Sequence, residues 1–269
     1  MHFGYQSIYD TNFFEAIAYA RKHRFAYVSF DLNVPRFYIE RLSTAELQAI
    51  RRYAAEMGVG LAFHLPGDNV SLYADYPAIR RGILEHFTAI LHAAEALGAR
   101  HVTVHTGNCP SFKQANAQED AFIVEYGKYF SAVLDENLRH LAAQTSGVML
   151  CVENYLFTPI TMATIAKLLA DGTRLYLTWD LAKTYTGDPL QRNAEIAAFM
   201  WQHQHYIREI HAHDLNTRLR SHQIIGEGII DFSEYIPLFR RDYIATTLEV
   251  RPRKAATISR DRLLSLITD

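Results

Sequence analysis

The chain has 269 residues, and barrels of about 250 residues commonly fold as one unit, so one large domain is the expected organisation. Hydrophobic residues make up 49% and charged residues 21% of the sequence, which excludes an intrinsically disordered chain. The 27 basic and 29 acidic residues give a formal charge of −2, which disfavours proteins that bind nucleic acid or an anionic membrane through a basic surface.

Short apolar segments alternate along the chain with longer segments of helical periodicity. The apolar segments are rich in Val, Ile, Leu, Phe and Tyr, which is typical of buried parallel strands. They span residues 2–5, 25–30, 60–64, 101–105, 148–153, 175–180, 209–213 and 244–249. The segments of helical periodicity span residues 13–23, 45–57, 78–97, 120–144, 161–169, 193–205, 231–240 and 255–267.

This alternation predicts a parallel sheet whose strands are joined by right-handed helical crossovers. About eight strand–helix units favour a closed barrel over an open doubly wound sheet. A dinucleotide-binding fold would need a glycine-rich turn after the first strand, whereas residues 6–12 read QSIYDTN. We therefore predict an α/β protein, a single (β/α)8 TIM-barrel domain over residues 1–269, with no organic cofactor.

The third to eighth predicted strands all end in a histidine or a carboxylate. These residues are His64, His105, Glu153, Asp180, His213 and Glu249. The carboxyl ends of barrel strands face the active-site mouth, and unpaired charges are not tolerated in a packed interior. Any one of the six could be a hydrogen-bonded core residue. Together they predict a site for one divalent ion (Mn, Zn, Co or Mg), because such ions bind carboxylate oxygens and imidazole nitrogens.

Several short motifs follow one another in a recognisable order. They are V-E-N at 152–154, W-D at 179–180, H-x-H-D at 211–214, G-E-G-x-I-D-F at 226–232 and L-E at 248–249. This order resembles the xylose-isomerase-like TIM-barrel superfamily, which includes sugar and sugar-phosphate isomerases and epimerases, inosose dehydratases and zinc-dependent apurinic-site endonucleases. The resemblance covers nearly the whole chain and does not select one member.

The resemblance implies a ligand set for the predicted metal. The family's ligands match Glu153, Asp180, His213 and Glu249. His64 and His105 match histidines that bind another zinc in the endonuclease branch and that lie near the substrate in some sugar enzymes, so they are expected at a second metal or at the substrate.

Two positions depart from the family pattern. Where the family often has D-x-x-H after the sixth strand, this chain has Lys183, and where the endonuclease branch has an aspartate two residues before a loop histidine, Arg220 precedes His222. Two of that branch's three ligands for a third zinc are thus cations here, which disfavours cleavage of apurinic DNA.

The predicted chemistry depends on Glu153 and Glu249, which come from strands on opposite sides of the mouth. One carboxylate can remove a proton next to a carbonyl and the other can return it, through an enediolate that the metal stabilises. We therefore expect an isomerase or epimerase of a sugar, sugar phosphate or polyol, with these two glutamates catalytic. The alternatives are an endonuclease-like, metal-dependent phosphodiesterase in which both glutamates are only ligands, and a non-enzymatic metal-binding protein.

Further residues are expected to contact the substrate. These are Lys183, His211, Arg220, His222 and Arg251. Of these, His211 is expected to orient the metal ligands, and Arg251 follows the eighth strand, where barrels often bind phosphate. The expected partner is a small carbohydrate and not nucleic acid, and the sequence leaves a homo-oligomer open. Two cysteines, no leader-like start and no apolar run of about 18 residues predict a cytoplasmic protein with no membrane partner.

Overall fold

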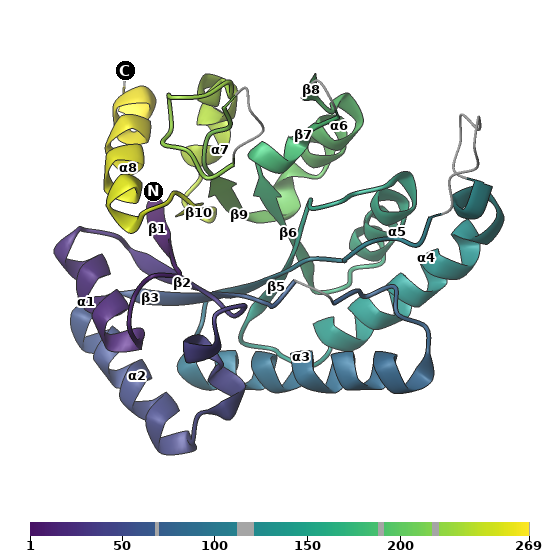
Figure 1. Cartoon of the computed structure of the whole chain (residues 1–269), viewed down its shortest axis with the longest axis horizontal. Helices are drawn as coiled ribbons and strands as arrows, with labels where there is room; N and C mark the ends of the chain where they lie inside the picture. The colour runs from purple at the N-terminus through teal and green to yellow at the C-terminus, as the bar shows by residue number, and fades with distance from the viewer. Residues whose placement is uncertain (68–69, 112–120, 188–190, 217–220, 269) are drawn as a thin grey trace.

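A closed barrel of eight parallel strands forms the centre of the computed structural model, which describes residues 1–67, 70–111, 121–187, 191–216 and 221–268 (Figure 1). The strands are β1 (His2–Ser7), β2 (Tyr27–Asp31), β3 (Gly60–His64), β4 (His101–Val104), β5 (Met149–Glu153), β6 (Leu175–Asp180), β9 (Ile207–Ala212) and β10 (Ala245–Leu248). They neighbour one another in the order β1-β10-β9-β6-β5-β4-β3-β2, with β2 closing onto β1. The predicted TIM barrel is thereby confirmed.

Helices follow the strands and surround the barrel (Figure 1). They are α1 (Phe13–Lys22), α2 (Thr44–Met57), α3 (Pro77–Leu97), α4 (Ala121–Ala142), α5 (Pro159–Ala170), α6 (Ala194–Gln202), α7 (Ile236–Phe239) and α8 (Arg253–Thr268). Local signals set their ends: the Ser43 hydroxyl and Glu46 form a capping box at the start of α2, and Gly58 ends it with a left-handed φ of 63°.

The prediction of one helix over 231–240 is wrong. The segment forms a 3-10 helix, η5 (Phe232–Tyr235), followed by the single turn of α7. Pro237 lies in the first turn of α7, where its ring is tolerated, but it has no backbone N–H to donate to the carbonyl four residues earlier, so one continuous α-helix cannot run through this position. The sequence pattern also missed the antiparallel pair β7 (Tyr185–Thr186) and β8 (Gln191–Arg192) and the 3-10 helices η1 (Pro35–Phe37), η2 (Ile39–Arg41), η3 (Ala182–Thr184) and η4 (Gln204–Tyr206).

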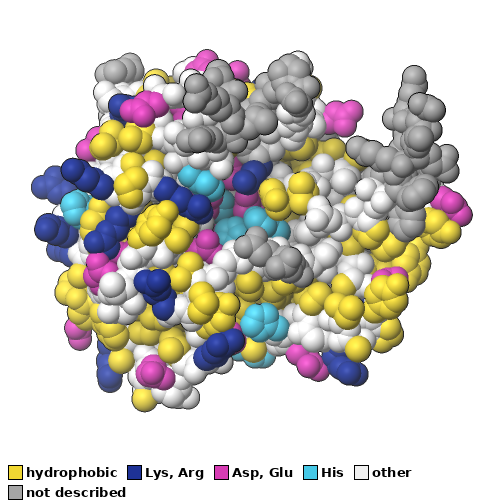
Figure 2. All heavy atoms as spheres, viewed as in Figure 1, with side chains coloured by type: hydrophobic (Ala, Val, Ile, Leu, Met, Phe, Trp, Pro, Cys, Tyr) yellow, Lys and Arg dark blue, Asp and Glu magenta, His cyan; other side chains and the backbone are white. Residues whose placement is uncertain are grey.

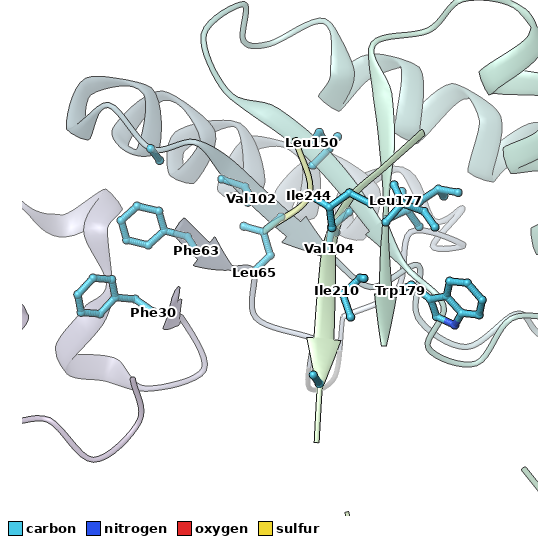
Figure 3. Packing of buried hydrophobic residues seen from close by; sticks show 14 of the residues in the cluster. Phe30, Phe63, Leu65, Val102, Val104, Leu150, Leu177, Trp179, Ile210 and Ile244 are labelled. Carbon is cyan, nitrogen blue, oxygen red and sulfur yellow. The ribbon is translucent and has the colours of Figure 1, made fainter. Parts of the chain in front are cut away.

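Alternation along each strand separates two environments. Apolar residues such as Val102, Val104, Leu177 and Ile210 are fully buried in the layer between strands and helices (Figure 3). The residues between them point into the barrel, as shown by Thr103 on β4, which hydrogen bonds to Thr178 on β6 across the intervening strand β5. The polar residues of the strands therefore gather inside the barrel.

The amino-terminal end of the barrel interior is filled by Tyr27, whose hydroxyl hydrogen bonds to Thr247 at 2.7 Å. Gly4 on the neighbouring strand is required there, because a Cβ at this position would lie 2.5 Å from the Tyr27 ring. The ring closes this end of the barrel, so the cavity described below opens at the opposite end. No helix among the described residues is both long enough and apolar enough to span a membrane.

Candidate active site and metal centre

A cavity of about 410 Å³ opens at the carboxyl ends of the strands; we call it the mouth cavity. Its lining residues are Gln6, Ile8, Asp31, Asn33, His64, His105, Glu153, Tyr155, Lys183, His222, Glu249 and Arg251. In the space-filling view, acidic and histidine side chains gather in a central depression with basic side chains beside it (Figure 2).

The structure brings most of the predicted site residues together. His64, His105, Glu153, Lys183, His222, Glu249 and Arg251 line the mouth cavity, whereas Asp180, His211 and His213 are fully buried beside it. Arg220 lies outside the described residues. Sequence reasoning missed Gln6 and Asp31, at the ends of β1 and β2, and Asn33, two residues after β2.

Two histidines converge on one oxygen of Glu153. His64 Nε2 lies 3.0 Å and His105 Nε2 lies 2.9 Å from Glu153 Oε2. Burial would lower the pKa of His64, but the hydrogen bond and charge of Glu153 outweigh it and raise this pKa to about 9. Burial would likewise raise the pKa of Glu153, yet His105 and His211 hold it well below its usual value, so Glu153 is ionised.

Asp180 and His213 form a second buried pair, with Asp180 Oδ2 at 3.3 Å from His213 Nε2. Asp180 Oδ1 accepts hydrogen bonds from the backbone of Ala182 and Lys183, the first residues of η3, at 2.8 and 3.0 Å. Its other oxygen therefore stays directed at His213. The backbone N–H of His222 donates to His213 Nδ1 at 3.0 Å, which leaves Nε2 as the nitrogen that faces Asp180.

His222 is held in an unusual backbone conformation. Its φ of 61° lies in the left-handed region, which a residue other than glycine rarely adopts. The His222 ring donates from Nδ1 to the backbone carbonyl of Glu249 at 2.7 Å. Burial, His213 and Arg251 lower the pKa of His222 to about 3, so its ring is neutral.

The donor atoms have the spacing of a metal site. Three groups each have donor atoms within 4.8 Å of one another: His64, Glu153 and His211; His213, His222 and Glu249; and Asp180, His211 and Glu249. The groups overlap, since Glu249 and His211 each belong to two of them. The donors are carboxylate oxygens and imidazole nitrogens only, which fits a divalent ion such as Mn or Zn.

A carboxylate that the sequence analysis missed, Glu209, lies inside the barrel beneath these groups. Its side chain is fully buried and accepts hydrogen bonds from the hydroxyls of Thr103, Thr178 and Thr247. His101 Nε2 lies 2.9 Å from Glu209 Oε1. The signal for Glu209 is the two-residue spacing of Glu209, His211 and His213, which turns all three side chains into the barrel.

His211 connects Glu209 to the mouth. Its Nε2 lies 3.2 Å from Glu209 Oε2, and its Nδ1 lies 3.2 Å from Glu249 Oε1 and 3.5 Å from Glu153 Oε2. Burial would lower the pKa of His211, but the three carboxylates raise it well above its usual value. His211 therefore lies under the mouth cavity as a cation, while Gln6 Nε2 donates to Glu249 Oε1 at 2.8 Å from another side.

Lys183 extends over the mouth cavity from η3, with its Nζ 5.1 Å from the centre of the Tyr155 ring. Burial would lower the pKa of Lys183, but the nearby charges of Asp180, Glu153 and Glu249 raise it. Lys183 is therefore protonated. It offers a hydrogen-bond donor where the superfamily often has a histidine, and it cannot be a metal ligand in this state.

The comparison with known families agrees with this architecture. A family model described as "Xylose isomerase-like TIM barrel" matches residues 17–265. The match covers most of the chain, which therefore belongs to the xylose isomerase-like TIM-barrel family, as its motifs indicated.

Solved structures share the whole fold at low sequence identity. A D-tagatose 3-epimerase-like protein aligns with 18% identity and a TM-score of 0.78 over 100% of this chain and 97% of its own. D-psicose 3-epimerase, whose structure was solved with D-fructose, has 14% identity and a TM-score of 0.74, with both chains fully covered. The 3-keto-D-glucoside 4-epimerase from E. coli has 15% identity and a TM-score of 0.69, again over both whole chains. At these identities the likeness demonstrates the fold.

Proposed function

We propose that the protein is a divalent-metal-dependent isomerase or epimerase of a small carbohydrate. The observation that carries this proposal is the placement of Glu153 and Glu249. Both line the mouth cavity, and a single nitrogen, His211 Nδ1, lies within 3.5 Å of an oxygen of each. The two carboxylates therefore face one small volume of the mouth cavity. The sugar epimerases among the structural relatives support the same class of reaction.

The metal would be held by Glu153, Asp180, His213 and Glu249. When bound, a divalent ion polarises a carbonyl of the substrate and acidifies the neighbouring C–H bond. Glu153 and Glu249 then act as an acid–base pair: one carboxylate takes the proton from carbon, and the other delivers a proton to the opposite face or to the adjacent carbon. Delivery to the opposite face gives an epimer, and delivery to the adjacent carbon gives an aldose–ketose isomer.

Other residues of the mouth cavity orient the reactants. His64 and His105 both engage Oε2 of Glu153, which restricts the rotation of this carboxylate. Lys183 and Arg251 carry N–H donors into the mouth cavity, where sugar hydroxyls accept hydrogen bonds. These contacts would bind the substrate with its reacting carbon between the two glutamates.

The proposal is tested by product analysis. The purified protein, reconstituted with Mn²⁺, is incubated with a panel of ketoses and keto sugars, and epimers and isomers are separated by chromatography. Glu153→Gln and Glu249→Gln are each expected to lower the rate about 10²- to 10⁴-fold, the usual contribution of a positioned acid or base. Glu136→Gln serves as the matched control, because Glu136 pairs with Arg80 on the surface. Equal rates in the wild type and both site variants would refute the proposal.

One observation favours the alternative, a metal-dependent phosphodiesterase acting on apurinic DNA. Once His64 and His211 release their protons, the group of His64, Glu153 and His211 could hold a second ion next to the first, as two-metal hydrolases require. Against it, the protonated Lys183 occupies a position at which the endonuclease branch has a ligand for a third zinc. We therefore rank this activity below sugar isomerisation.

A further inference from the structure

A second cavity, of about 470 Å³, adjoins the mouth cavity; we call it the side pocket. The two cavities share Tyr155 and Lys183 as lining residues. The side pocket lies between the segment that follows β5 and the segment that leads from η3 to α6. Its apolar lining comes from Leu156, Phe157, Tyr185 and Ile196.

Two polar side chains of the side pocket, those of Thr158 and Asn193, are already engaged by the protein. Thr158 Oγ1 accepts the backbone N–H of Thr161 at 3.2 Å and so caps α5. Asn193 Oδ1 accepts the backbone N–H groups of Glu195 and Ile196 at 3.0 and 3.1 Å and so caps α6. These contacts consume hydrogen-bonding capacity that a hydroxylated ligand would need, and they favour an apolar occupant.

Leu156 has a strained backbone conformation. Its φ is 57°, in the left-handed region that asparagine and glycine adopt at lower cost, and its side chain is 43% exposed. An exposed leucine on strained backbone gains little from burial. Leu156 does line the side pocket, so the strained backbone holds an apolar side chain at this pocket.

The boundary between the two cavities is suited to a ligand that crosses it. The Tyr155 ring packs against the His105 ring, with centroids 4.5 Å apart, and Lys183 Nζ lies 5.1 Å from the centre of the same Tyr155 ring. The Tyr155 ring and the Lys183 ammonium group therefore lie at the boundary between the two cavities. A ligand that fills both cavities would have the bond between its polar ring and its substituent at this boundary. The aromatic ring and the ammonium are groups that contact sugar rings and oxygens well.

We propose that the side pocket binds an uncharged apolar substituent, aryl or alkyl, of a sugar whose ring occupies the mouth cavity. This inference rests on the proposed function and refines its substrate class from a free monosaccharide to a glycoside. Because a substituent on the anomeric oxygen keeps the ring closed, the carbonyl beside which a proton moves is then a keto group on the ring.

The test compares affinities within matched pairs of probes. Calorimetry with the Mn²⁺-loaded protein measures Kd for the phenyl and methyl β-glycosides of glucose, galactose and xylose. Burying a phenyl ring predicts about tenfold or tighter binding of the phenyl member in at least one pair. The absence of a phenyl preference in every pair would overturn the proposal. So would tighter binding of cellobiose than of phenyl glucoside, since that result assigns the side pocket to a second sugar.

A pair of variants ties the preference to the side pocket. Leu156→Asn is expected to bring the phenyl-to-methyl affinity ratio towards one, while the melting temperature stays the same or rises because asparagine suits this backbone. Ile258→Asn is the control, because Ile258 on α8 is 41% exposed and does not line the side pocket. An unchanged ratio in Leu156→Asn would refute the inference. These measurements need no turnover, so the inference and the proposed function can fail separately.

Discussion

His211 Nε2 lies 3.2 Å from Glu209 Oε2, in a barrel interior that the solvent does not reach. An isolated buried carboxylate is costly, so the three threonine hydroxyls and two histidines around Glu209 are needed to keep it ionised. The opposite nitrogen of His211 faces Glu249 and Glu153. One imidazole thus links a carboxylate within the barrel to the two carboxylates on which the proposed chemistry depends.

The effect of replacing Glu209 on the free energy of unfolding tests whether His211 and Glu209 interact as charged groups. Burial would raise the pKa of Glu209, but His101 and His211 lower it well below 4.5. A carboxyl whose pKa is lower in the folded state contributes stability that is present above the unfolded pKa and is lost as the pH falls through the folded one. Glu209→Gln should therefore cost about 3 kcal/mol near pH 7, the scale for breaking a buried ion pair, and progressively less below about pH 4.5.

Urea denaturation of the wild type and Glu209→Gln at several pH values between 3 and 7 measures this difference. Glu136→Gln, in which an exposed carboxylate is removed, should change the free energy of unfolding by less than about 1 kcal/mol. A cost for Glu209→Gln that is the same at every pH would show that shape, rather than charge, is what Glu209 contributes.

If the proposed residues bind the metal, removing one of them should lower the metal content of the protein. His213→Ala and Asp180→Asn each remove one donor, and elemental analysis after dialysis against a fixed concentration of free Mn²⁺ should show much lower occupancy than in the wild type. His86→Ala and Asp171→Asn are matched controls at positions outside the three donor groups. Full occupancy in both site variants would exclude the site as drawn.

The loop that carries His222 depends on Asp214. Its carboxylate accepts the backbone N–H groups of Leu215, Gly226, Gly228 and Ile230 at 2.8–3.1 Å. A Cβ at Gly228 would lie 2.0 Å from the Leu215 carbonyl oxygen, so Gly228→Ala must displace this loop. We expect a loss of about 2 kcal/mol or more in thermal unfolding.

Gly82→Ala gives the opposite sign and serves as the control. Gly82 lies within α3 with open space around its Cα, so alanine should stabilise the helix by about 0.5–1 kcal/mol. If Gly228→Ala proved as stable as the wild type, the inference that this loop packs tightly against Asp214 would be wrong.

Abasic DNA should remain intact. A nicking assay on an oligonucleotide with one abasic site, with added Zn²⁺ and Mn²⁺, is expected to show no metal-dependent cleavage, because the protonated Lys183 repels a third divalent ion. Robust nicking by the wild type that disappears in Glu153→Gln would favour the phosphodiesterase activity over the proposed isomerase activity.

The barrel could be predicted from the sequence because its strands carry two signals at once. Their β-branched and aromatic residues mark buried strands, and their last residues, such as His64 and Glu153, are polar where an interior residue would not be. The pair of strands β7 and β8 escaped prediction because strands of two residues have no periodicity to detect.

The residues of the mouth cavity that carry no charge were harder to predict from the sequence. Gln6 on β1 and Asn33, two residues after β2, contribute amide groups, and uncharged amides are common at the surface of any protein. Glu209 was overlooked for another reason: it lies in the middle of β9, and only the partners that other strands bring to it reveal why a carboxylate is buried there.

The central claim is that Glu153 and Glu249 exchange a proton with a carbon next to a carbonyl. It is tested most directly by mass spectrometry of keto sugars incubated with the Mn²⁺-loaded protein in deuterated water. The wild type and the control Glu136→Gln should incorporate deuterium at that carbon, and Glu153→Gln and Glu249→Gln should do so at least about 100-fold more slowly. Incorporation that proceeds undiminished in both variants would contradict the account.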